Sequence, residues 1–122
     1  MENVLDDEYD DSFLSPNHQK IAELNDQFRK SFCGGKVLMT CGIDALDWAT
    51  KAKIISKVQK FNEFNFKNDP HGEHDFGIVQ EGDVEAYWKI DYYDKTLTYG
   101  SENPADESIT TRVLTILLPI EY

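Results

Sequence analysis

The chain has 122 residues, of which 40% are hydrophobic and 12% aromatic, and its formal net charge is −11. This length and composition predict one folded domain with its own hydrophobic core rather than a disordered chain. No apolar run approaches the roughly 20 residues that a membrane-spanning helix needs. The acidity argues against direct binding to nucleic acid or to membrane phosphates, and it favours basic partners.

The cysteines and the N-terminal residues indicate the cellular compartment. Cys33 and Cys41 are too few for a disulfide scaffold and lack zinc-ligand spacing. The first residues have neither the basic nor the apolar region of a secretory signal. We therefore expect a cytoplasmic protein with reduced thiols and with no metal or other cofactor.

Negative charge is concentrated in two segments. Residues 1–11 carry six acidic residues and no basic one, and residues 68–107 carry eleven acidic residues against two basic ones. Residues 12–67 have the opposite balance, with nine basic and five acidic residues. We interpret residues 1–14 as an acidic N-terminal arm and residues 15–122 as a single α+β domain.

Two helices and a short strand are predicted first along the chain. Ser15-Pro16 provides an N-cap and a proline at the first helical position. Apolar residues recur at helical spacing as far as Phe28, and Gly34-Gly35 ends this helix. Residues 36–41 form a short β-prone run. Asp44 or Asp47 then caps a second helix, whose predicted apolar stripe is Trp48, Ala52, Ile55 and Val58.

A loop rich in turn-forming residues over 68–72 leads into a sheet. We predict strands over 73–80 and 84–93, joined by Glu81-Gly82-Asp83, and a third strand over 97–100. The spacing in residues 108–118 suits a helix, which we favour, whereas its Thr, Val and Ile content suits a strand. The predicted fold is α+β, with a small, mostly antiparallel sheet of three to four strands and a C-terminal helix or strand.

The hairpin geometry assigns faces to the acidic block at 73–75. If Gln80 lies opposite Val84, then His74, Phe76 and Ile78 face the core. Side chains alternate along a strand, so Glu73 and Asp75 would then face outward, opposite Asp91 and Lys89 respectively. This register predicts an ion pair between Asp75 and Lys89 and a repulsive pair between Glu73 and Asp91.

His74 has two interpretations. We favour a core histidine whose ring nitrogen bonds the backbone of loop 68–72. The alternative is a metal-dependent hydrolase or nuclease-like enzyme that uses His74 with Glu73, Asp75 or Asp91. No spacing here matches H-E-x-x-H or another strong metal motif, so we assign no catalytic or metal-binding residue.

Several blocks of the sequence resemble a bacterial family catalogued as a domain of unknown function. The resemblance covers about residues 20–122 and rests on the order and spacing of N-D-P-x-G-E-H-D-F-G from Asn68, W-K-I-D-Y-Y-D from Trp88 and R-V-L-T-I from Arg112. His71 departs from the pattern, which often has tyrosine there. The acidic arm lies outside the resemblance.

The resemblance implies a protein of bacteria and their plasmids or phages. By analogy with small acidic proteins of that origin, we expect an inhibitor of host defence, of the anti-CRISPR or anti-restriction type. Its partner would be a basic nucleic-acid-handling protein or nucleoprotein complex. The carboxylates predicted to bind this partner are Glu73, Asp75, Glu81, Asp83, Glu85, Asp91 and Asp94 in the domain, and Asp6, Asp7, Glu8, Asp10 and Asp11 in the arm.

Overall fold

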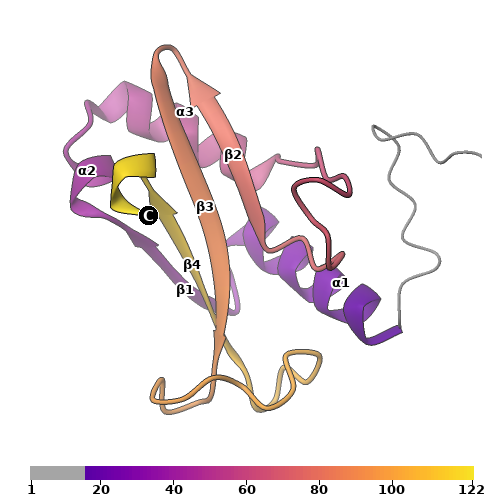
Figure 1. Ribbon diagram of the computed structural model, residues 1–122. Helices are drawn as coiled ribbons and strands as arrows, with labels where there is room; N and C mark the ends of the chain where they lie inside the picture. Colours follow the sequence, from indigo (N-terminus) through magenta and orange to yellow (C-terminus); the bar gives the residue numbers. More distant parts are fainter. Residues whose placement is uncertain (1–15) are drawn as a thin grey trace, which may run out of the picture.

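The computed structural model describes residues 16–122 (Figure 1). The acidic arm predicted over residues 1–14 lies outside this part of the chain. The elements, in chain order, are α1 (Pro16–Ser31), β1 (Gly35–Met39), α2 (Cys41–Asp44), α3 (Trp48–Gln59), β2 (Phe76–Glu81), β3 (Val84–Tyr93), β4 (Thr111–Leu117) and the 3-10 helix η1 (Pro119–Glu121).

The four strands form one mixed sheet in the order β1-β4-β3-β2. β1 runs parallel to β4, and the other two pairings are antiparallel. Both long helices, α1 and α3, lie behind the sheet in Figure 1 and cover one of its faces. This arrangement confirms the α+β class. No helix within residues 16–122 combines the length and apolar character needed to cross a bilayer.

The hydrophobic core lies between the two helices and the sheet. Trp88 is fully buried at its centre, together with Ile54 and Val58 of α3. Asp47 caps α3 by accepting a hydrogen bond from the backbone N–H of Thr50. Of the two predicted caps, Asp44 and Asp47, the second is therefore the cap of this helix. The predicted apolar stripe was wrong at its first position, because Trp48 is 82% exposed.

The segment that we favoured as a C-terminal helix is instead the strand β4. It lies between β1 and β3 in the sheet, and Val113 and Leu114 are both buried although they point to opposite faces. A strand buried on both faces loses the polar–apolar alternation, and its apolar residues then also fit helical spacing. The predicted third strand over 97–100 was also wrong, since only Gly100 forms an isolated bridge, to Tyr93.

The register of the hairpin differs from our prediction by one residue. Phe76 pairs with Lys89, and Glu81 pairs with Val84. The turn therefore has two residues, with Gly82 at φ +61°, which is typical of tight hairpins. The shift reverses the faces of β2. Gly77 and Val79 face the core, whereas Phe76 and Ile78 face outward, and the predicted Asp75–Lys89 and Glu73–Asp91 cross-strand pairs do not form.

Gly77 provides a test of this register. A Cβ added there would lie 2.7 Å from Cε2 of Trp88 and 2.9 Å from Cζ of Phe61. We expect Gly77→Ala to lower the free energy of unfolding by about 1–3 kcal/mol through overpacking. Gly100→Ala is the matched control, because the nearest atom to its Cβ would be 3.8 Å away, and it should change stability by less than about 0.5 kcal/mol. Equal midpoints for both variants in urea unfolding would contradict the register.

Candidate functional site

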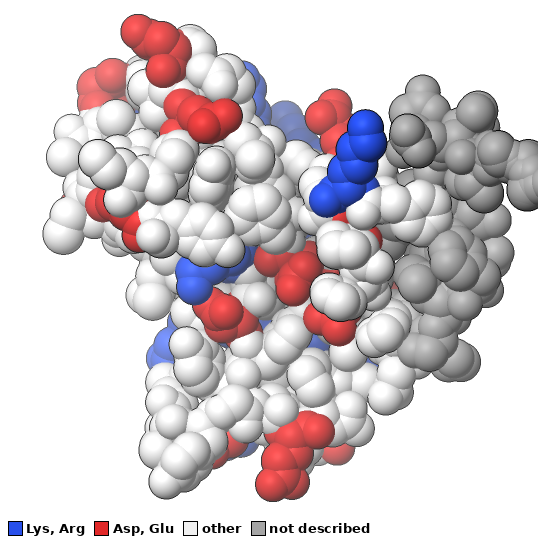
Figure 2. Space-filling model, in the orientation of Figure 1, with Lys and Arg blue, Asp and Glu red and all other residues white. Residues whose placement is uncertain are grey.

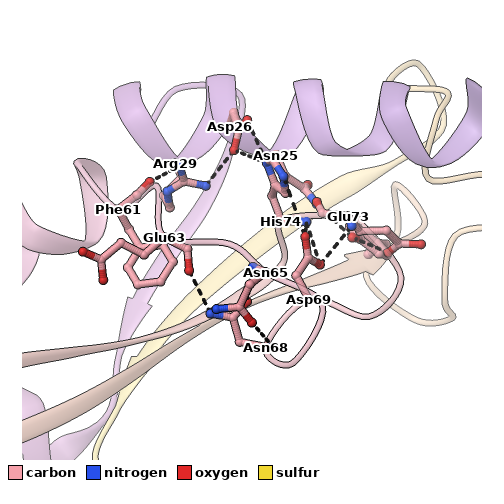
Figure 3. Close-up of polar contacts among 11 residues, drawn as sticks. Asn25, Asp26, Arg29, Phe61, Glu63, Asn65, Asn68, Asp69, Glu73 and His74 are labelled. Carbon is pink, nitrogen blue, oxygen red and sulfur yellow. Dashed lines mark hydrogen bonds and ion pairs between the residues drawn. The ribbon is translucent and has the colours of Figure 1, made fainter. Parts of the chain in front are cut away.

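A cluster of polar residues is buried where α1 meets the loop before β2 and the ends of β3 and β4 (Figure 3). Polar side chains of this kind are seldom fully buried without specific partners. Four of its members, Asn25, Arg29, Asp69 and Arg112, are each 4% exposed or less. We call it the polar cluster, and its members are Asn25, Asp26, Arg29, Asp69, Glu73, His74, Tyr92 and Arg112.

Asp69 organises the loop that carries the acidic block. Its carboxylate accepts hydrogen bonds from the backbone N–H groups of Glu73 and His74, and its backbone carbonyl accepts one from Gly72. Gly72 and His74 both have positive φ, of 69° and 55°. The turn-forming sequence before β2 therefore folds around one buried carboxylate, which fixes where His74 points.

His74 lies against α1 rather than in a strand. Its Nδ1 is 2.9 Å from Oδ2 of Asp26, and its Nε2 is 3.7 Å from Oδ2 of Asp69. The ring stacks on Phe64 at a centroid distance of 4.0 Å, and the side chain is 15% exposed. The ring nitrogens thus face two carboxylates, that of Asp26 in α1 and that of Asp69 in loop 68–72, the loop whose backbone we predicted as the partner of this histidine.

Arg29 joins α1 to the end of α3. Its Nη1 donates to Asp26, and its Nε and Nη2 donate to the backbone carbonyls of Val58 and Phe61. Its guanidinium also lies 5.0 Å from the ring centroid of Trp88. Burial would raise the pKa of Asp26, but the hydrogen bonds and positive charges of His74 and Arg29 outweigh it and lower that pKa.

Asn25 connects the acidic block to the sheet. Its Nδ2 donates to the backbone carbonyl of Glu73 and to Oη of Tyr92, and its Oδ1 accepts from Nε of Arg112. Tyr92 in turn donates to the Glu73 carboxylate at 2.9 Å. Burial and the charges of Asp75 and Glu73 raise the pKa of Tyr92, so its hydroxyl keeps the proton that it donates.

Among the carboxylic acids of this region, Asp75 has the pKa that is shifted furthest from its ordinary value. Burial, followed by the charges of Glu73 and Asp69, raises its pKa to about 6. Its backbone carbonyl accepts from Ile90, which attaches this residue to the edge of β3. Three carboxylates thus lie close enough to repel one another, and Asp75 changes its charge near neutral pH.

The residues of the alternative enzyme site do not all meet. Glu73 is bonded by Tyr92, which lies on the inner face of β3. Asp91 lies on the opposite face of β3, where it pairs with Lys89 at 2.7 Å. His74 instead meets Asp26 and Asp69. Within residues 16–122, no group of three or more His, Cys, Asp or Glu side chains is arranged to hold a metal ion.

The carboxylates predicted to bind a partner have varied surroundings. Glu81 pairs with Lys57 at 2.9 Å, and Asp94 accepts hydrogen bonds from Thr96 and Thr98 within a turn. Asp83 and Glu85 are exposed at the tip of the β2–β3 hairpin. The five predicted arm residues, Asp6, Asp7, Glu8, Asp10 and Asp11, lie outside the described residues.

The sequence analysis missed those members of the polar cluster that come from α1 and β4. Asn25 and Arg29 follow Ile21 at intervals of four, on the buried side of α1. Polar residues at positions of an apolar stripe are a usable signal, because they need buried partners. No comparable signal marks Arg112, which the sequence places inside an apparently uniform β-prone run.

The fold and the polar cluster together define a small α+β domain whose helix, loop and sheet are joined by buried ionic hydrogen bonds. The model of a family described as "Protein of unknown function (DUF3768)" matches residues 39–121, and the chain belongs to this family. This confirms the expectation of a family without an assigned function. No curated protein and no solved structure matches the chain.

Replacing Arg29 by lysine tests the importance of the buried guanidinium. Lysine keeps the charge but cannot reach Asp26 and two carbonyls with a planar fork. We expect Arg29→Lys to lower the free energy of unfolding by about 2–4 kcal/mol, because buried acceptors lose their donors. Lys30→Arg, at the exposed neighbouring position, should change it by less than about 0.5 kcal/mol. Equal denaturation curves for the two variants would show that the Arg29 contacts contribute little.

The raised pKa of Asp75 predicts that replacing this residue stabilises the fold by an amount that depends on pH. The charged form is disfavoured in the folded state, so Asp75→Asn should raise the free energy of unfolding at pH 7 by about 1–2 kcal/mol. Between about pH 4 and 6 the folded protein holds a proton that the unfolded chain has released. The advantage of the variant therefore declines as pH falls through 6 and is absent near pH 4.

Chemical denaturation of wild type and variant at several pH values measures this difference. Glu85→Gln is the control, since Glu85 is exposed, and it should differ from wild type by less than about 0.5 kcal/mol throughout. A difference between Asp75→Asn and wild type that stays constant from pH 4 to 7 would mean that Asp75 ionises as an ordinary surface acid.

Proposed function

We propose that this chain is a small acidic interaction protein of the cytoplasm that inhibits a host-defence complex by binding its basic, nucleic-acid-handling protein. The observation that carries this proposal is the outer face of the sheet, which neither long helix covers. Aromatic side chains lie across this face, and carboxylates lie at its edge.

The centre of this face is a contact group of three rings, Phe76, Tyr87 and Tyr122. Their centroids lie 5.5 to 6.1 Å apart, and Tyr122 is 73% exposed. Ile78, which pairs with Tyr87 and is 44% exposed, extends the apolar surface along β2. Exposed aromatic groups of this kind form the energetic centre of many protein interfaces. We call these four residues the aromatic face.

Charge complementarity identifies the kind of partner. Figure 2 shows acidic groups at the hairpin tip and near the loops at the opposite end, with basic and acidic groups together in the middle of this face, where Lys89 pairs with Asp91. Asp83 and Glu85 lie at that tip, beside the outer face. The chain as a whole has a net charge of −11, which attracts cationic surfaces and repels nucleic acid. A protein surface that normally holds phosphates fits this pattern.

The sequence resemblance implies an origin in bacteria and their plasmids or phages, and such an origin favours a host-defence protein among the possible basic partners. Proteins that protect a mobile element act on the nucleases that would cut it, such as CRISPR effectors and restriction enzymes. Their nucleic-acid channels are lined with Lys and Arg, where carboxylates of the hairpin tip would take the place of phosphates.

The test is inhibition of target-DNA cleavage by a panel of purified CRISPR effector complexes and restriction endonucleases. We expect at least one to be inhibited, in competition with its DNA and less effectively at high salt. Asp83→Lys with Glu85→Lys should weaken that inhibition by about tenfold or more, and Tyr87→Ala should weaken it similarly through loss of apolar contact.

The matched control is Glu23→Lys with Glu63→Lys, which reverses two exposed acids away from the sheet's outer face and changes the net charge by the same amount. This variant should keep most of the inhibition. Equal weakening by both double variants would assign the effect to net charge alone and contradict a specific surface. No inhibition of any panel member by the wild-type protein would contradict the proposed function.

A further inference from the structure

A small pocket of about 230 Å³ lies at the end of the sheet opposite to the hairpin tip, between α1 and the 94–110 loop. Phe28 of α1 and Gly34 line one side, and Lys95, Glu107 and Arg112 line the other. The volume is below the roughly 300–1,000 Å³ of pockets for drug-sized ligands. It suits a small group rather than a large cofactor.

Arg112 is the unusual member of this lining, because it is a charged side chain that is only 4% exposed. Its Nε donates to Asn25 and its Nη2 to the carbonyl of Pro104, and its guanidinium stacks over Tyr92 at 5.3 Å. Among the described residues, Nη1 has no hydrogen-bond acceptor, and no carboxylate lies within 4.0 Å of the guanidinium.

A buried guanidinium without a carboxylate partner is costly, and a bound anion would offset that cost. Asn25, Pro104 and Tyr92 hold the group rigidly, so it is already oriented for a ligand. Lys95 adds a second positive charge to the pocket. The negative charges that act on Arg112 are those of Glu107, which lines the pocket, and Glu73, and the burial of Arg112 outweighs them and lowers its pKa.

We propose that this pocket binds a phosphate group, with Arg112 and Lys95 as its cationic donors and Glu107 as a neighbouring charge that weakens the binding. Two cations match the double negative charge of a phosphate better than the single charge of a carboxylate. The inference does not rest on the proposed inhibitory function, because the pocket lies away from the aromatic face.

The experiment is an NMR titration of the amide signals with inorganic phosphate at constant ionic strength. We expect the signals of Gly34 and Thr110, which line the pocket, to shift in a saturable way. Lys95→Gln should weaken binding by about threefold or more, and Glu107→Gln should strengthen it by a similar factor, since each changes one charge near the ligand. Lys20→Gln, at an exposed position of α1 outside the pocket lining, is the matched control and should bind as wild type.

Arg112→Lys should abolish the saturable shifts in a protein whose spectrum stays dispersed. If this variant unfolds, the opposite effects of Lys95→Gln and Glu107→Gln still decide the question, because both positions are exposed. Acetate provides the carboxylate comparison, and equal affinity for acetate and phosphate would overturn the phosphate assignment. Absence of saturable shifts, or equal phosphate affinity in the Lys95, Glu107 and Lys20 variants, would overturn the site altogether.

Discussion

The buried guanidinium of Arg29 is the interaction on which the rest of the arrangement depends. It holds α1 against the end of α3 through two backbone carbonyls, contacts Trp88 at the centre of the core, and orients Asp26. Asp26 in turn meets His74, which fixes the loop before β2. A charge buried in this way is stable only with all its partners, so the helices and the loop have one mutual arrangement.

The polar cluster and the aromatic face divide the molecule into two sides with different roles. On the helix side, the Glu73 carboxylate is engaged by Tyr92, that of Asp26 by the His74 ring, and that of Asp69 by backbone N–H groups. On the open side of the sheet, aromatic rings are exposed. Much of the acidity that looks available for a partner in the sequence is therefore part of the fold. Of the seven carboxylates predicted in the domain to bind a partner, the two classed as exposed are Asp83 and Glu85 at the hairpin tip.

Local signals in the sequence were enough for the helices, the hairpin strands and the α+β class, because caps, glycines and spacing act over a few residues. Local signals were insufficient where contacts between distant parts of the chain determine the type of element or the strand register. β4 is a strand because β1 and β3 flank it, although its spacing also suits a helix. A one-residue difference in turn length reversed the faces of β2. Asp26 and Arg29 were missed as members of the cluster because the residues that they contact outside α1 lie 29 to 48 positions away.

The parallel pairing of β1 with β4 has a consequence for how this protein reaches its folded state. Gly35 and Arg112 are partners although they lie far apart in the chain, and β4 also completes the pairing of β3. β1 therefore has no sheet neighbour until β4 is in place, so the early strand stays open to the wrong partners during synthesis. Pairings between such distant segments slow folding and prolong exposure of apolar strands.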